Sequence, residues 1–325
     1  MAEKVPVFFK TFDIDPRAIA AELEQGLRAE QAHCSPKYFY DALGSTLFDA
    51  ITHLPEYYPT RTEAGIFAAH AASIHHCIPA KAAWVDLGAG SCRKAASLFS
   101  QTLPAVYVAV DISLDYLTDT LLNLQRSHPA VEMVGVGMDF SNALTFPPEL
   151  SESLNNHPVF AFYPGSSLGN FTPEQALGFL RRIVELCKKG QPGSGLLIGI
   201  DLVKATHTLE HAYDDDLGVT AAFNLNVLRH INSLLGTDFD VRDWRHQALF
   251  NEAESRIEMH LHAKRAVSVR WGNQQRDFAE GESIHTENSY KWRLADFKRL
   301  LQEAGFTQSQ YWTDPQEQYA LFWAS

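Results

Sequence analysis

The sequence predicts an α/β protein: a parallel sheet that ends in an antiparallel hairpin, joined to a second domain of α+β type. Three observations predict this class. Short apolar runs alternate with helical segments over residues 82–203, as in parallel sheets with right-handed crossovers. Over residues 245–271 the apolar positions recur every second residue, which indicates antiparallel strands. Two further segments, 309–313 and 318–322, flank Asp314-Pro315 and predict the terminal hairpin.

The elements are expected in a simple order along the chain. A first helix should cover residues 16–33, and helical character resumes over residues 63–77. The predicted strands of the parallel sheet are 82–87, 105–111, 131–138, 158–163 and 195–203, and the helices between them are 93–102, 113–126 and 172–189. Beyond the sheet, residues 205–236 and 292–304 should each form a helix that ends at a glycine.

Composition limits the possible functions. The chain has 325 residues, enough for two joined domains. Its net charge of −12 argues against nucleic-acid binding, which needs clustered Lys and Arg. No apolar run approaches the ~20 residues of a membrane span, and residues 1–4 lack the apolar core of a signal peptide. The cysteines (Cys34, Cys77, Cys92 and Cys187) are scattered, which fits reduced thiols. We therefore expect a cytoplasmic protein that acts on a small molecule, without a membrane or an obligatory protein partner.

Two separated motifs indicate a cofactor that carries a nucleoside. An apolar run over residues 84–87 leads into Gly88-Ala89-Gly90, where glycines let the backbone approach a ligand closely. A second apolar run ends at Asp111, and an acid at the end of a strand suits the two hydroxyls of a ribose. Glycine and aspartate also collect at strand ends simply to form turns, which is the alternative explanation.

The nucleoside is better matched to S-adenosylmethionine (SAM) than to NAD. A dinucleotide fingerprint requires a third glycine where this chain has Arg93, whereas SAM has no phosphate and needs only the shorter Gly-x-Gly. A third apolar run ends in Asp139-Phe140, a carboxylate and a ring that suit the amino group and the face of adenine. A parallel sheet closed by a helix and a terminal hairpin is also typical of class I, Rossmann-like methyltransferases. An NAD-dependent dehydrogenase stays as the alternative.

Further motifs along nearly the whole chain carry a family resemblance. They are Pro36-Lys37-Tyr38-Phe39-Tyr40-Asp41, Phe48-Asp49, the run from Leu54 to Glu63, Ala212-Tyr213-Asp214-Asp215, the run from Gly218 to Asn224, and Thr286-Glu287-Asn288-Ser289. In these segments the chain strongly resembles the histidine-specific, SAM-dependent methyltransferases of ergothioneine biosynthesis. The resemblance implies an enzyme that converts L-histidine to its Nα-trimethyl betaine, hercynine, in three successive methyl transfers.

The resemblance also implies how the chain divides into domains. Residues 64–203 and 287–325 should bind SAM. Residues 1–63 and 204–286 should form the substrate domain, which consists of an N-terminal segment and an insertion after the fifth strand of the sheet. The insertion begins where the alternation of strands and helices stops.

The resemblance assigns substrate-binding roles residue by residue. Glu287 and Ser289 would hold the imidazole ring, and their spacing of two on an extended segment lets them point the same way. Tyr40 would lie at the amine, where a phenol can orient the lone pair or accept a proton. The remaining substrate contacts are Met259 along the ring, Asn170 and Tyr213 on the carboxylate, and Gly165, Phe48 and Tyr57 around the site.

The cofactor residues implied by the resemblance are Gly88, Gly90, Lys94, Asp111, Asp139 and Phe140, with Lys94 on the methionyl carboxylate. Methyl transfer from a sulfonium needs a correctly placed amine rather than a strong nucleophile, so neither a catalytic triad nor a metal is expected.

Two alternative functions concern the same site. Asn288 and Tyr290-Lys291-Trp292 are more polar and more aromatic than is usual in this stretch of the family and could reshape the side-chain pocket. This allows another aromatic amino acid, such as tyrosine or tryptophan, as substrate. A non-catalytic SAM sensor is the second alternative, and the presence of Glu287 and Asn170 argues against it.

Histidine patterns raise the question of a metal. His207, Glu210 and His211 form an H-x-x-E-H pattern, as in some zinc peptidases. With 14 histidines in the chain, one chance match is unsurprising. His260 and His262 share one face of a strand and could hold a metal ion, or could simply be solvated.

Overall fold

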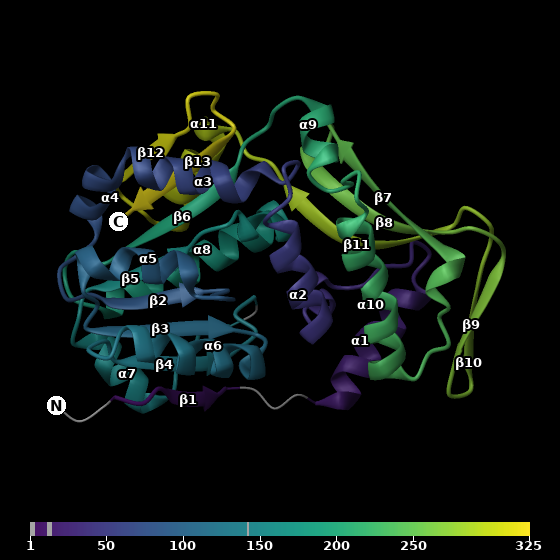
Figure 1. The fold of residues 1–325 in the computed structure, drawn as a ribbon, viewed down its shortest axis with the longest axis horizontal. Coiled ribbons are helices and arrows are strands. Elements are labelled where there is room, and N and C mark those ends of the chain that lie inside the picture. The colour runs from purple at the N-terminus through teal and green to yellow at the C-terminus, as the bar shows by residue number, and fades with distance from the viewer. Residues whose placement is uncertain (1–3, 12–14, 142) are drawn as a thin grey trace. The chain divides into compact units, whose positions relative to one another are not determined.

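A computed structural model of the chain describes residues 4–11, 15–141 and 143–325 (Figure 1). The chain divides into two compact units. Unit 1 contains residues 61–202 and 292–325 together with the described residues of 1–13, and unit 2 contains the described residues of 14–60 together with residues 203–291. Residues 1–3, which belong to the stretch without a signal-peptide core, lie outside the described residues. No helix in the described part of the chain combines the length and apolar character needed to cross a membrane.

Unit 1 is built on one mixed sheet. Its strands are β1 (Val7–Lys10), β2 (Ala83–Leu87), β3 (Val106–Asp111), β4 (Met133–Gly137), β5 (Val159–Tyr163), β6 (Gly195–Asp201), β12 (Ser309–Thr313) and β13 (Tyr319–Ala324). The order across the sheet is β1-β4-β3-β2-β5-β6-β13-β12. The strands from β1 to β6 are parallel, and β13 runs antiparallel to both β6 and β12. This is the sheet of class I, Rossmann-like methyltransferases, as predicted.

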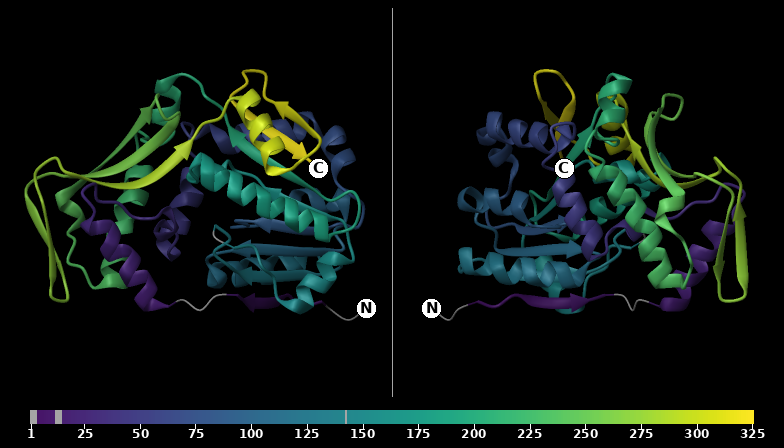
Figure 2. Two further views of the ribbon diagram at one scale, coloured as in Figure 1. Left: turned by 180° about the vertical axis from the view of Figure 1, so that it is seen from behind. Right: turned by 45° about the vertical axis from the view of Figure 1, so that its right-hand side comes forward.

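Helices cover both faces of this sheet. They are α3 (Tyr58–Ala69), α4 (Ala71–Cys77), α5 (Arg93–Thr102), α6 (Leu114–Ser127), α7 (Pro148–Asn155), α8 (Pro173–Lys189), α11 (Leu294–Ala304) and the short η2 (Ser167–Asn170). On one face, Trp84 of β2 packs against Phe99 of α5. On the other, Tyr163 of β5 packs against Phe179 of α8, which crosses the sheet in the view from behind (Figure 2). Burial from both sides explains why these strands are continuously apolar.

Unit 2 combines helices with antiparallel strands. β7 (Trp244–Asn251), β8 (Arg256–Ala263) and β11 (Ser283–Tyr290) form a sheet in the order β11-β8-β7, and β9 (Val267–Trp271) pairs with β10 (Gln274–Phe278) in a separate hairpin. The helices are α1 (Pro16–Arg28), η1 (Pro36–Phe39), α2 (Ala42–Ile51), α9 (Thr206–His211), α10 (Val219–Leu235) and η3 (Val241–Asp243). α10 is central, because it packs against α1, η1, α2 and β7.

The alternation along β8 separates two faces of this sheet. Ile257, Met259 and Leu261 are buried in the core of unit 2. Glu258 and His260 lie on the opposite face and are half-buried. Side chains of β11 follow the same alternation through their pairing with β8, apart from a register shift between His285 and Glu287.

The unit boundaries differ from the expected domains slightly at residues 61–63, which belong to unit 1, and at Val203, which belongs to unit 2. Two further differences are larger. Val7–Lys10 was expected in the substrate domain, but these residues form β1, which pairs in parallel with β4 and so belongs to unit 1. Residues 287–291 were expected in the SAM-binding domain. They belong to unit 2, because residues 287–290 complete the pairing of β11 with β8.

The expected helix over residues 205–236 is also two helices. α10 starts afresh after Gly218, which has a positive φ of 73°, and Asp215 accepts hydrogen bonds from the N–H groups of Val219 (3.0 Å) and Thr220 (2.7 Å). Such a carboxylate cap satisfies the first amides of a new helix, so the chain stops and restarts here.

Candidate active site

The turn after β2 brings together the two motifs that indicated a nucleoside. Gly88 and Gly90 have positive φ values of 68° and 49°, a conformation that glycine adopts without strain. The N–H of Gly90 donates to Oδ2 of Asp111 at 2.9 Å, and the N–H of Gly88 donates to the carbonyl of Val110 at 2.8 Å. Residues 21 positions apart therefore meet at the carboxyl edge of the sheet.

Asp111 is held by backbone amides on both oxygens. Its Oδ1 accepts from the N–H of Ser113 at 3.0 Å. Burial raises the pKa of Asp111, and the hydrogen bonds from the N–H groups of Ser113 and Gly90 oppose this change. A carboxylate oxygen has more than one lone pair, so Asp111 can still accept the hydroxyls of a ribose.

Phe140 lies beside the glycine turn. A Cβ atom on Gly88 would stand 3.7 Å from the ring of Phe140, and Oδ1 of Asp139 accepts from the N–H of Ser141 at 3.0 Å. The backbone of the glycine turn, the ring of Phe140 and the carboxylates of Asp111 and Asp139 thus lie at one edge of the parallel sheet. This donor and acceptor set fits the adenosyl group of SAM.

Glu63, the last residue of the Leu54–Glu63 motif, is a buried carboxylate that had no predicted role, and it organises the next loop. Glu63 is 1% exposed, and its Oε1 accepts from the N–H of Gly165 and from the hydroxyl of Tyr319, both at 2.7 Å. Its Oε2 accepts from the ammonium of Lys94. Lys94 was predicted to meet the methionyl carboxylate of SAM, and in the structure its ammonium is already oriented by Glu63.

The loop that follows β5 is a left-handed turn. Gly165 and Ser166 have φ values of 81° and 59°, and the hydroxyl of Ser166 accepts from the N–H of Asp201 at 2.9 Å. Asn170 ends the short helix η2 that follows, and its side chain is half-buried. The turn fixes where Gly165 and Asn170 lie in unit 1.

Asp86, at the end of β2, is a second carboxylate to which the sequence motifs gave no role. It is 3% exposed and accepts a hydrogen bond of 2.6 Å from the hydroxyl of Tyr107. Burial raises the pKa of Asp86 to about 7. Its contacts are structural, and it supports the strand from which the glycine turn departs.

In unit 2, the predicted aromatic residues form a continuous row. The ring centroids of Tyr40 and Phe48 are 5.9 Å apart, those of Phe48 and Tyr57 6.3 Å, and those of Tyr57 and Tyr213 6.2 Å. Phe223 of α10 packs against Tyr40 at 5.9 Å and was not predicted as a site residue. Residues from the N-terminal segment and from the insertion therefore share one surface.

The predicted imidazole ligands leave β11 on the core side of its sheet. Glu287 pairs directly with Met259 of β8, and Ser289 pairs with Ile257. Residues that face each other in an antiparallel pair project to the same side. Glu287, Ser289 and Met259 therefore share a face, as their spacing predicts. The hydroxyl oxygens of Ser289 and Tyr213 are 2.8 Å apart, which joins this face to the aromatic row.

Lys291 completes the polar cluster and was not predicted as a site residue. It is 3% exposed, and its ammonium donates to the hydroxyls of Ser289 (2.9 Å) and Tyr213 (3.0 Å). It also lies 4.6 Å from the ring centroid of Tyr213. Two signals in the sequence pointed to it: its place in the stretch that departs from the family pattern, and its spacing of two from Ser289.

Tyr213 is also held through its backbone. Nε2 of His246 donates to the carbonyl of Tyr213, and Nδ1 accepts from the amide of Asn224, both at 2.8 Å. These partners define a neutral imidazole with its proton on Nε2. Burial lowers the pKa of His246, while the hydrogen bond to Tyr213 and the nearby Asp214 and Asp215 oppose this change.

Asn288 and Tyr290 lie on the other face of β11. Asn288 pairs with Glu258, and Tyr290 pairs with Arg256 and accepts a hydrogen bond of 2.6 Å from its guanidinium. Their polarity and size therefore act on the face opposite to Glu287 and Ser289. Within the stretch that departs from the family pattern, Lys291 is the residue that contacts Ser289 and Tyr213.

In the part of the chain that the structure describes, the three side chains of the H-x-x-E-H pattern do not converge as a group that could hold a metal ion. His207 and His211 stack on α9 with ring centroids 4.3 Å apart, but Oε1 of Glu210 accepts from the N–H of Phe250 at 3.0 Å. Among the described residues, the side chains that converge in a possible metal-binding group are Glu258, His260 and His285 instead.

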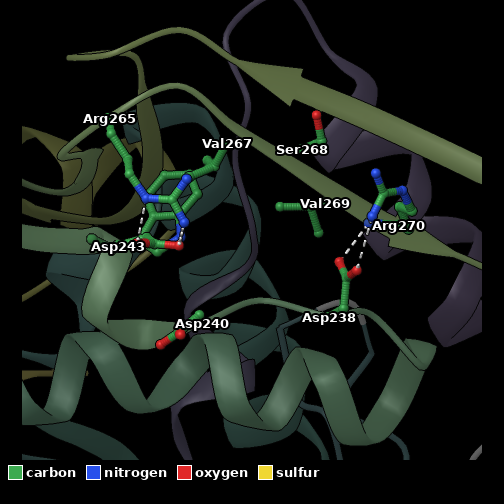
Figure 3. A pocket seen from close by; sticks show the side chains of 9 residues that line it. Asp238, Asp240, Asp243, Arg265, Val267, Ser268, Val269 and Arg270 are labelled. Atoms are coloured by element: carbon green, nitrogen blue, oxygen red, sulfur yellow. Dashed lines mark hydrogen bonds and ion pairs between the residues drawn. The ribbon is translucent and has the colours of Figure 1, made fainter.

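A pocket of 340 Å³ beside the β9–β10 hairpin is not lined by any of the predicted site residues (Figure 3). Four of its five charged side chains pair with one another, and the fifth, Asp240, pairs with Arg242 outside the lining. Arg265 donates to both oxygens of Asp243 at 2.9 and 2.7 Å, and Arg270 lies 4.0 Å from Asp238. We assign it no ligand.

The predicted site residues divide between the two units. Unit 1 holds Gly88, Gly90, Lys94, Asp111, Asp139, Phe140, Gly165 and Asn170, and unit 2 holds Tyr40, Phe48, Tyr57, Tyr213, Met259, Glu287 and Ser289. The predicted cofactor residues all belong to unit 1, and the predicted imidazole ligands and the aromatic row all belong to unit 2.

Comparison with known proteins adds an independent line of observation. A family model described as "Histidine-specific methyltransferase, SAM-dependent" matches residues 19–325. The chain is 39% identical over 315 residues to the histidine N-alpha-methyltransferase of Mycolicibacterium smegmatis, across 95% of each chain. It is 38% identical over 310 residues to the protein of that name from Mycobacterium tuberculosis, across 94% of each. It is also 31% identical over 287 residues to ergothioneine biosynthesis protein 1 of Neurospora crassa, across 84% of this chain and 31% of that one.

Proposed function

We propose that this chain, which belongs to the family of histidine-specific, SAM-dependent methyltransferases, converts L-histidine to hercynine by three successive methylations of the α-amino group. This is the first step of ergothioneine biosynthesis. The observation that carries the substrate assignment is the polar set on one face of unit 2, in which Glu287 lies across from Met259 and Ser289 is hydrogen-bonded to Tyr213. We further propose that the enzyme works in the cytoplasm without an obligatory protein partner.

The site has to present a neutral amine to an electrophilic methyl group. SAM, when bound, supplies that methyl group on a sulfonium, and Gly88, Gly90, Asp111, Asp139, Phe140 and Lys94 are the residues proposed to hold it. The rate then depends mainly on how well the amine lone pair is positioned for in-line attack. Groups that orient the substrate are therefore more important than a strong base.

Glu287 and Ser289 together select a neutral imidazole. The carboxylate of Glu287 accepts from a ring N–H, and a hydroxyl donates to the other ring nitrogen. Lys291 donates to the oxygens of both Ser289 and Tyr213, so the two hydroxyl protons must point elsewhere. One can lie between Ser289 and Tyr213, and the other can then serve the substrate. Asn170 and Gly165 keep their proposed roles as substrate contacts from unit 1.

Tyr40 is the proposed catalytic residue. Its phenol can orient the amine or accept its proton between transfers, directly or through a water molecule. Tyr40 packs against Phe48, and the aromatic row continues to Tyr57 and Tyr213. Aromatic faces attract an ammonium ion, so this row suits a product that ends as a quaternary cation.

Mass spectrometry of the purified chain with histidine and SAM tests the function. We expect mono-, di- and trimethylhistidine to accumulate, with the trimethyl product last. Turnover of tyrosine or tryptophan, with histidine left unmodified, would reassign the substrate. Methyl transfer that survives EDTA would show that the reaction needs no metal ion, unlike zinc peptidase chemistry.

Replacing Glu287 by Ala tests the imidazole contact. We expect histidine binding to weaken by about 1.5–3 kcal/mol, because one charge-assisted hydrogen bond is lost. SAM binding should be unchanged, since the cofactor residues belong to unit 1. Isothermal titration calorimetry with each ligand measures both effects.

Glu254→Ala is the matched control, because Glu254 is exposed in the turn between β7 and β8. It should change neither affinity. If Glu287→Ala weakens both ligands equally, Glu287 is structural and the imidazole contact is wrong.

A further inference from the structure

Three side chains of the kinds that bind metal ions, Glu258, His260 and His285, converge on the face of unit 2 opposite to the proposed histidine site. His260 of β8 and His285 of β11 face each other across the strands, with ring centroids 4.8 Å apart and an angle of 17° between the rings. Glu258 precedes His260 by two residues and so lies on the same face. Each of the three side chains offers one ligand atom, and all these atoms lie within 4.8 Å of one another.

The two oxygens of the Glu258 carboxylate make different contacts. Its Oε1 accepts from Nε of Arg256 at 2.8 Å and from the amide of Asn251 at 3.0 Å. Its Oε2 instead faces His260, 3.1 Å from Nε2. One oxygen is therefore fixed by outer hydrogen bonds while the other is directed into the cluster.

The two histidines are oriented in a similar way. Nε2 of His285 donates to the backbone carbonyl of Glu287 at 3.0 Å, which leaves its Nδ1 as the nitrogen able to bind a cation. In His260, Nε2 is the nitrogen that faces Oε2 of Glu258. Its Nδ1 is buried and has no hydrogen-bond partner among the described residues, so this nitrogen too is able to bind a cation. Metal-binding histidines typically donate their second N–H to a carbonyl or carboxylate, and ligating carboxylates are themselves hydrogen-bonded.

From this arrangement we propose that Glu258, His260 and His285 form a binding site for a divalent transition-metal ion, with Zn²⁺ as the natural candidate. Two imidazoles and one carboxylate suit zinc and its neighbours in the first transition row, whereas Mg²⁺ and Ca²⁺ prefer oxygen ligands alone. Metal bonds of about 2.0–2.2 Å require the ligand atoms to draw closer than they are here, which small side-chain rotations achieve. Arg256 offsets part of the charge of Glu258, so the site should bind more weakly than a structural zinc site.

The proposed metal site is also connected, through the backbone of β11, to the substrate face within unit 2. The pairing of β11 with β8 shifts register between His285 and Glu287, and His285 is bonded to the carbonyl of Glu287. An ion that fixes His285 would fix this irregular stretch of backbone, and with it the residue proposed to hold the imidazole of the substrate. This consequence, unlike the metal site itself, rests on the proposed function.

Titration of the tag-free, full-length chain with Co²⁺ tests the site without substrate or SAM. Visible absorption of bound Co²⁺ reports nitrogen and oxygen ligands, and Zn²⁺ should displace it. We expect saturable binding of one ion, weakened roughly tenfold or more in His260→Ala and His285→Ala. Glu258→Gln should weaken it too while retaining an acceptor for Arg256 and Asn251, and so protects the test against misfolding.

His211→Ala is the matched control, because His207 and His211 form another stacked histidine pair outside the proposed site. This variant should keep the Co²⁺ spectrum and affinity of the unmodified chain. Absence of saturable binding, or equal binding by the unmodified chain and the His260 and His285 variants, overturns the site.

The coupling needs a second measurement. Histidine affinity is compared with and without one equivalent of Zn²⁺ in the unmodified chain and in His260→Ala, since free histidine chelates the ion equally in both. We expect a change of roughly fivefold or more in the unmodified chain alone. The same response in both proteins overturns the coupling. Failure to bind histidine at all contradicts the proposed function instead.

Discussion

Lys291 determines how the hydroxyls of the proposed histidine site are directed. An ammonium group has three donors and no acceptor. Because it donates to both Ser289 and Tyr213, each oxygen already accepts one proton, and the pair as a whole becomes a donor toward a ligand. Glu287 offers the opposite polarity on the same face of β11. A neutral imidazole, with one N–H and one bare nitrogen, matches this combination.

Replacing Lys291 by Met tests this polarity. We expect histidine binding to weaken by about 1.5–3 kcal/mol, as for loss of a hydrogen bond to a charged group, with SAM binding unchanged. Calorimetry with each ligand gives both values. Lys204→Met is the matched control, because the ammonium of Lys204 donates to the hydroxyl of Tyr58 at 2.6 Å and lies over its ring. If both substitutions reduce histidine affinity to a similar extent, the effect of Lys291 does not depend on its contacts with Ser289 and Tyr213.

At the residue scale, the sequence could predict contacts within motifs but not between distant ones. The spacing of Glu287 and Ser289 on an extended segment sufficed to place them on one face, and the register with β8 agrees. Glu63 gave no such signal. Its partners lie 31, 102 and 256 residues away, so only the folded sheet brings them together.

β6 packs directly against the hydrogen-bonded side chains of Glu63 and Tyr319. Gly199 lies in β6, and a Cβ atom at this position would collide with Oε1 of Glu63 and with the hydroxyl of Tyr319. Both groups are buried and hydrogen-bonded to each other, so neither can move without cost. The absence of a side chain at Gly199 is therefore what allows Glu63 to hold Gly165 and Lys94.

Gly199→Ala should lower the free energy of unfolding by about 1–3 kcal/mol, as overpacking does in cores. It should also weaken SAM binding, because Glu63 would no longer hold Lys94 and the Gly165 turn in place. Gly65→Ala, in α3, is the matched control: a Cβ atom there meets nothing within 4 Å, and alanine stabilises a helix by about 0.5–1 kcal/mol. In urea unfolding the free energies of the two variants should move in opposite directions, and in SAM titration only Gly199→Ala should lose affinity. A stable, SAM-binding Gly199→Ala would refute the role of β6.

Strong local patterns explain which elements the sequence could predict. The apolar runs of β2 to β6 and the capping box of α8, from Thr172 to Gln175, appear where expected. β1 was missed because four residues at the edge of a sheet carry little periodicity, and two of them are half-buried. The break between α9 and α10 was missed because it depends on the capping contact of Asp215 rather than on a change in hydrophobic pattern.

At the scale of the whole molecule, buried titratable groups give stability a pH dependence with opposing contributions. The folded pKa of His246 is lowered by burial, so below about pH 6.5 the unfolded chain binds a proton that the folded chain does not. Stability from this group therefore falls as pH falls. Asp86 behaves in the reverse way. Its folded pKa is raised to about 7 from 3.8, so its contribution falls as pH rises through that range.

His246→Gln separates the two contributions, because it removes one titrating group and leaves Asp86 in place. The glutamine amide can still donate to the carbonyl of Tyr213. We expect the stability difference, unmodified chain minus variant, to increase from pH 5 to pH 7 and to stay level above it. Within the range from pH 6.5 down to pH 5, this stability difference should change by about 1.4 kcal/mol for each unit by which the pKa of His246 is lowered. Urea unfolding at pH 5, 6, 7 and 8 measures it. A difference that stays constant from pH 5 to pH 8 would mean that His246 titrates alike in both states, contrary to its 2% exposed side chain and its two hydrogen bonds.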